Sequence, residues 1–69
     1  MISNRKTITQ EIARICGWDN AMLTCEVDTE TNAVTYRLRT YQRGVGAHEQ
    51  LFSTYANAVE ALDNFKKML

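Results

Sequence analysis

The chain has 69 residues, of which 45% are hydrophobic and 23% charged, a composition typical of one small soluble globular domain. Eight basic residues balance eight acidic ones, which disfavours general nucleic-acid binding and excludes a strongly acidic DNA mimic. A chain this short buries only about 60% of its unfolded surface. A catalytic cleft would therefore compete with the core, and a homodimer is one expected state.

The first predicted element is a helix over residues 7–16. Three isoleucines recur at spacings of four and three, which places them on one apolar stripe. They are Ile8, Ile12 and Ile15. Thr7 and Gln10 have the spacing of a capping box, and Gly17 would end the helix. We expect Trp18 to fold back on the helix end.

Two strands follow, joined by a polar turn over residues 29–32. Apolar and polar residues alternate in both segments, as in half-buried strands. The apolar members are Leu23, Cys25 and Val27 in the first strand and Val34, Tyr36 and Leu38 in the second. Pairing Val27 with Val34 brings every apolar residue opposite an apolar partner, and a slip of one residue would separate the two apolar faces.

Glycines at both ends of residues 44–46 predict the next turn. A third strand is expected over residues 47–53. A two-residue turn would point Leu51 inward with Leu38, and a three-residue turn would point Phe52 inward instead. The larger ring gains more from burial, which favours Phe52.

The last predicted element is a helix from about Tyr55 to the C-terminus, with Thr54 as its N-cap. Its apolar stripe comprises Tyr55, Ala58, Val59, Leu62, Phe65 and Leu69. The sequence therefore predicts a single α+β domain over residues 1–69 with the order α-β-β-β-α. The simplest arrangement places both helices on one face of a three-stranded antiparallel meander and leaves the other face open.

The open face is expected to carry the candidate partner-binding residues. Its predicted members are Thr24, Glu26, Asp28, Arg37, Arg39, Tyr41, Arg43 and Glu49. Arg37, Arg39, Tyr41 and Arg43 are the candidate contacts, because arginine and tyrosine are enriched at interface hot spots. The same residue types also suit nucleic acid, with arginine on phosphate or guanine and tyrosine stacked on a base. A solvated face balanced by cross-strand ion pairs is the third interpretation.

The sequence indicates no catalytic, cofactor or metal site. His48 is the only histidine and cannot complete a four-ligand zinc site with Cys16 and Cys25. Both cysteines are expected to face the core as free thiols, and Cys25 is expected to point away from His48. No phosphate-binding or dinucleotide glycine motif is present. Residues 1–10 lack the apolar core of a signal peptide, and no apolar run has membrane-spanning length, so we expect a cytoplasmic protein.

Two features of the sequence, the order of its predicted elements and residues 51–63, resemble known families. The predicted α-β-β-β-α order resembles the double-stranded-RNA-binding domain, whose second helix starts with a basic cluster. The matching residues 55–60 contain no lysine or arginine, so RNA binding is not implied. Residues 51–63 are similar to the strand-to-helix joint of the ethylene-response-factor DNA-binding domain and related integrase arm domains. That resemblance implies DNA contacts for Arg37 and Arg39 on an open sheet face.

Residues 9–17 also resemble the first helix and turn of a helix-turn-helix. The recognition helix would then span residues 20–28, which contain Glu26 and Asp28 and no basic residue. Acidic groups facing phosphate would be repelled, which disfavours this interpretation.

The leading hypothesis is a small non-enzymatic interaction module that binds a protein partner through its open sheet face. Small neutral chains without catalytic motifs are typical of phage and mobile-element proteins that antagonise or adapt a host machine, including anti-CRISPR-like inhibitors. The alternative is a nucleic-acid-binding domain that uses the same arginine and tyrosine residues.

Overall fold

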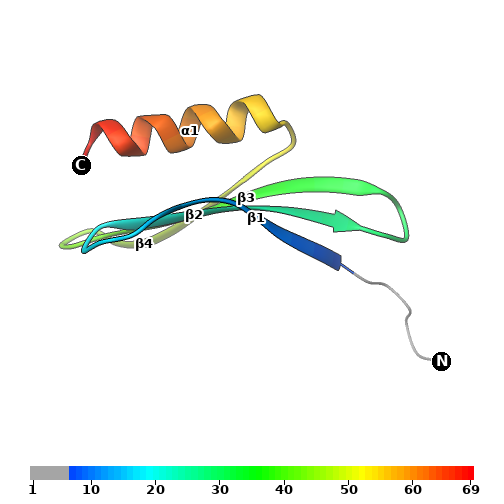
Figure 1. The fold of residues 1–69 in the computed structure, drawn as a ribbon, viewed down its shortest axis with the longest axis horizontal. Coiled ribbons are helices and arrows are strands. Elements are labelled where there is room, and N and C mark those ends of the chain that lie inside the picture. Colours follow the sequence, from blue (N-terminus) through cyan, green and yellow to red (C-terminus); the bar gives the residue numbers. More distant parts are fainter. Residues whose placement is uncertain (1–6) are drawn as a thin grey trace.

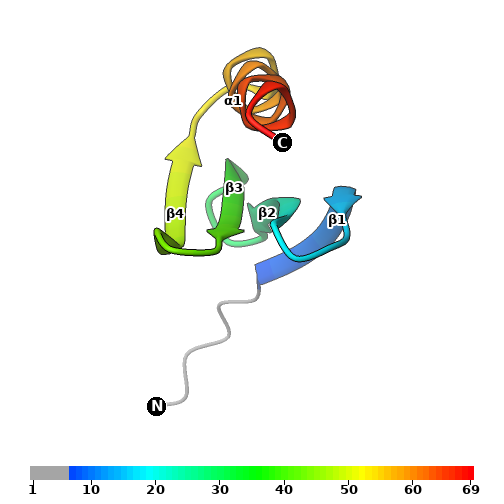
Figure 2. The ribbon, with the colours of Figure 1, turned by 90° about the vertical axis from the view of Figure 1, so that its left-hand side faces the viewer.

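The computed structural model describes residues 7–69, which form a four-stranded antiparallel sheet followed by one helix (Figure 1). The elements are β1 (Thr7–Ile15), β2 (Asn20–Asp28), β3 (Ala33–Gln42), β4 (Gly46–Phe52) and α1 (Tyr55–Lys67). The strands lie in the order β1-β2-β3-β4. The predicted α-β-β-β-α fold is therefore wrong. The helix covers one face of the sheet and leaves the other open, as the end-on view shows (Figure 2).

The segment predicted as the first helix is strand β1. Five of its nine residues are β-branched, which favours extended backbone. The register with β2 shifts between Glu11 and Ala13, which marks a β-bulge. In an unbroken strand, Ile8 and Ile15 would point to opposite faces, because their spacing is odd. The bulge brings both residues onto the face of the sheet that carries α1, and it thereby imitates helical spacing.

The turn that follows β1 also differs from the prediction. Gly17 has a φ of 143° and turns the chain into a hairpin instead of ending a helix. Trp18 lies in this turn with 76% of its surface exposed, so the prediction that it packs on a helix end is wrong. Cys16 is exposed, contrary to expectation, whereas Cys25 is half-buried, and both thiols are free.

The predicted pairing of the two central strands is confirmed. Val27 lies opposite Val34, and the buried Leu23 lies opposite Leu38. At the next hairpin, a three-residue turn separates β3 from β4 and places Phe52 on the face toward α1. Leu51 points the other way and is 58% exposed.

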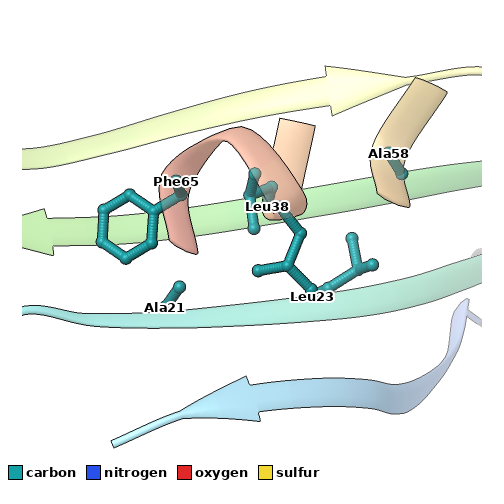
Figure 3. Packing of buried hydrophobic residues seen from close by; sticks show 6 residues of the cluster. Ala21, Leu23, Leu38, Ala58 and Phe65 are labelled. Carbon is teal, nitrogen blue, oxygen red and sulfur yellow. The ribbon is translucent and has the colours of Figure 1, made fainter. Parts of the chain in front are cut away.

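The core lies between α1 and the sheet. Its buried members are Ala21, Leu23 and Leu38 from the sheet and Ala58, Leu62 and Phe65 from α1 (Figure 3). Thr54 caps α1 as predicted, because its hydroxyl accepts a hydrogen bond from the backbone N–H of Asn57 at 3.3 Å. The helix lies over β2, β3 and β4. Full burial of a leucine stabilises the fold by about 1.5–3 kcal/mol.

Candidate functional site

Strand β3 places three of the four predicted contact residues on the open face. Leu38 is buried beneath α1, so Arg37, Arg39 and Tyr41 point to the opposite side of the sheet. Arg43 lies beyond the end of β3, in the turn to β4. The predicted row of four residues is therefore divided between a strand and a turn.

Arg37 lies at the centre of the open face and is held by two glutamates. Its Nε donates to Glu26 Oε2 at 2.7 Å, and its Nη2 donates to Glu26 Oε1 at 3.2 Å. Its Nη1 forms a further ion pair with Glu49 on β4. The hydrogen bond to Glu26 is the main cause that raises the pKa of Arg37 above its ordinary value, so this guanidinium stays charged. Arg37 thus connects β2, β3 and β4, and only 25% of its side chain is exposed.

The other arginines of the open face also have carboxylate partners. Arg39 Nε lies 3.4 Å from Glu49 Oε2, and 58% of its side chain is exposed. On β1, Arg14 Nη2 lies 2.6 Å from Glu11 Oε1, and it also donates to the sulfur of Met22 at 3.4 Å. The three arginines of the strands are therefore balanced by three glutamates, and the face is of mixed charge.

The two turns at one end of the sheet are joined to each other. The guanidinium of Arg43 lies 5.0 Å from the ring centroid of Trp18, in a cation–π contact. Asp19 Oδ1 accepts a hydrogen bond from the backbone N–H of Arg43 at 3.0 Å, across 24 positions of sequence. These two contacts join the β1–β2 turn to the β3–β4 turn and place the exposed indole against Arg43.

Tyr41 and Arg39 lie on β3 two and four positions before Arg43, near the end of the strand that leads to this contact. Tyr41 lies opposite Asn20 on β2 and Ala47 on β4, and it is 41% exposed. A shallow depression of about 320 Å³ adjoins both side chains and reaches β4. We call the cluster of Trp18, Arg39, Tyr41 and Arg43 the aromatic–arginine end. It combines two exposed aromatic rings with two arginines, the residue types enriched at interface hot spots.

The sequence interpretation missed Trp18 as a member of this cluster. The predicted first helix assigned the indole to the packing of a helix end. A signal was present, because Asp19 and Asn20 follow Trp18 directly and are typical of turns. An aromatic residue in a polar turn is expected to be exposed.

Two kinds of chemical site can be compared with the positions of the described residues. Within residues 7–69, no three histidine, cysteine, aspartate or glutamate side chains gather to hold a metal ion. His48 and Cys25 share the face toward α1, so the prediction that they point to opposite faces is wrong. They do not meet, because His48 is in register with Thr40 and Ala21, four positions along β2 from Cys25. In this part of the chain, no helix has the length and apolar character needed to cross a membrane.

Comparisons with family models, curated proteins and solved structures found no match to this chain. The resemblances to the double-stranded-RNA-binding and ethylene-response-factor domains therefore stay predictions. The helix-turn-helix interpretation has the wrong secondary structure, because residues 20–28 form strand β2.

Proposed function

We propose that this chain is a non-enzymatic interaction module that binds a protein partner through the aromatic–arginine end of its open sheet face. The observation that carries the proposal is Trp18, which is 76% exposed although its ring is in a cation–π contact with Arg43. An exposed indole gains when a partner covers it, and a ring that is already ordered loses little entropy on binding.

The charges around the cluster favour a protein over nucleic acid. Arg37 is occupied by Glu26 and Glu49, and Glu49 also approaches Arg39. A phosphate backbone next to these carboxylates would meet repulsion as well as attraction, whereas a protein surface of mixed charge can match both signs. An antagonist or adaptor of a larger assembly, such as a phage-encoded inhibitor, would need no more than such a surface.

A partner can be found by affinity purification and its binding site can then be tested by titration. The tagged chain is used to purify partners from its native host after nuclease treatment, and each candidate is then titrated as a purified protein. Trp18 is the only tryptophan in the chain, so its emission reports directly on the proposed site. Binding is expected to shift this emission to shorter wavelength as the ring leaves water.

The site variant is Arg39→Glu with Tyr41→Ala, and the matched control is Lys66→Glu with Tyr55→Ala on α1. Both variants lose one exposed tyrosine and reverse one charge. Since removal of a hot-spot residue costs about 2 kcal/mol or more, the site variant should bind at least about 30-fold more weakly, while the control binds like the wild type. Equal binding by the site variant and the wild type would place the contact elsewhere.

The nucleic-acid alternative is examined with labelled single- and double-stranded oligonucleotides at low salt. Anisotropy that rises on addition of the chain and falls steeply with added salt would favour that alternative. We expect no such rise.

A further inference from the structure

The two edge strands of the sheet are protected to different degrees. β1 carries the bulge at Glu11 and Ile12, which interrupts the regular spacing that another strand would need. β4 pairs with β3 without interruption from Gly46 to Phe52. It contains no lysine and no bulge, and the chain has no proline. Strand β4 therefore presents a regular edge that no other described strand pairs with.

The sequence of β4 is complementary to itself when it is reversed. The strand begins with the small residues Gly46 and Ala47 and ends with the large residues Leu51 and Phe52. An antiparallel copy centred on Glu49 would place Phe52 opposite Gly46 of the second copy and Leu51 opposite Ala47 of the second copy. Each large side chain would thus lie across from a small one, which allows close packing on both faces.

The charge at the centre of this pairing is compensated. The two copies of Glu49 would face each other, and like charges directly opposite each other are destabilising. Each carboxylate already pairs with Arg37 and lies 3.4 Å from Arg39 Nε of its own chain. Within each chain, Arg37 and Arg39 balance the charges of Glu26 and Glu49, so this group of four side chains has no net negative charge to oppose the pairing.

The helix leaves a groove of mixed polarity along the same edge. The groove has a volume of about 480 Å³ and runs between β4 and the C-terminal half of α1. Leu38, Phe65, Val45 and Met68 are among its lining residues, and the last two are 61% and 63% exposed. No described strand lies beyond β4 on this side of the groove. A second copy on β4 would provide a wall there.

We propose that β4 pairs with β4 of a second copy of this chain, in antiparallel register about Glu49, to form a symmetric homodimer. In this register each residue lies opposite a residue that points to the same face of its own sheet. Both helices therefore lie on one face of the joined sheet and both open faces on the other. The two grooves then meet at the seam and cover each other. Arg39 of the aromatic–arginine end lies beside the seam, where it approaches Glu49 of its own chain. Trp18 and Arg43 lie in the turns at one end of the sheet, so the dimer would present two copies of their contact.

The test uses charge at the positions next to the axis, His48 and Gln50, which would lie opposite each other between the copies and are both exposed. One variant carries His48→Lys and Gln50→Lys, and the other carries His48→Glu and Gln50→Glu. The matched control carries Ile8→Lys and Gln10→Lys, at the same spacing and on the same face of β1, the other edge strand. Circular dichroism verifies that each variant is folded.

Sedimentation equilibrium of the full chain, from about 1 µM to about 1 mM, gives the outcome. The wild type and the β1 control are expected to change from the mass of one chain to that of two as concentration rises. Each β4 variant alone should stay at the mass of one chain, and an equimolar mixture of the two should recover the mass of two. A wild type that remains a monomer at the highest concentration would overturn the proposal. So would β4 variants that dimerise alone as well as the wild type does, or folded variants that fail to pair when mixed.

Discussion

The two ends of the sheet are built from the same strands, yet only one of them is covered. From the middle of the sheet toward the β1–β2 and β3–β4 turns, Leu23, Leu38 and Ala21 are almost fully buried beneath α1. At the end with the β2–β3 hairpin, Val34 and Ile8 occupy equivalent inward positions but are 40% and 60% exposed. The hairpin extends beyond the first turn of α1 (Figure 1).

The difference follows from the lengths of the elements. Helix α1 has 13 residues and is about 20 Å long at 1.5 Å per residue. Strand β3 has 10 residues and is about 34 Å long at 3.4 Å per residue. One helix therefore cannot cover the whole strand, and alternation of apolar and polar residues predicts which face is apolar but not how much of it is buried.

The largest expected effect comes from truncating the covered end. Leu38→Ala leaves a cavity beneath α1 and should lower the free energy of unfolding by about 2–5 kcal/mol, which is much of the stability of a domain this small. Val34→Ala, at the uncovered end, should cost less than about 1 kcal/mol because its side chain already contacts water. Urea unfolding followed by circular dichroism measures both. Similar losses for the two variants would show that the hairpin end is buried in solution, for example by a partner.

The same contrast explains which parts of the fold the sequence could predict. The alternation of apolar and polar residues in β2 and β3 determined their register. A slip of one residue would separate the apolar face with Leu23 and Val27 from the one with Val34 and Leu38. Local spacing was misleading in β1, where the bulge places Ile8 and Ile15 on one face. A bulge depends on pairing with a neighbouring strand, and such pairing is not visible in local spacing.

The candidate site could be predicted only in part, because contacts between segments that are distant in sequence are not visible in local spacing either. The positions of Arg37, Arg39 and Tyr41 follow from strand alternation alone. The contact between Trp18 and Arg43 joins two turns that are distant in sequence, and it exists only because four strands form one meander. With a helix predicted in place of β1, the prediction contained no β1–β2 turn that could lie beside the β3–β4 turn.

A smaller effect is expected from the ion pairs on the open face. Glu26→Gln removes the main partner of Arg37 and should lower the urea midpoint by less than Leu38→Ala does, because Glu49 still pairs with Arg37 and ion pairs close to the surface contribute little. The loss should shrink as salt screens the pair. Glu60→Gln, at an exposed position on α1, is the control and should leave the midpoint nearly unchanged. A loss from Glu26→Gln that does not depend on salt would mean that packing, and not charge, connects the strands.

The smallest effect on stability is expected from Arg43→Ala at the aromatic–arginine end. An exposed cation–π contact contributes about 0.5–1 kcal/mol, and the backbone hydrogen bond from position 43 to Asp19 survives the substitution. The indole of Trp18 should nevertheless become more mobile, since its stacking partner is lost. Lower fluorescence anisotropy and faster quenching by acrylamide would report this change, and Arg14→Ala on β1 serves as the control. If Trp18 emission is unaffected while the fold is retained, the contact does not order the ring, and the proposed partner site loses the pre-organisation on which it depends.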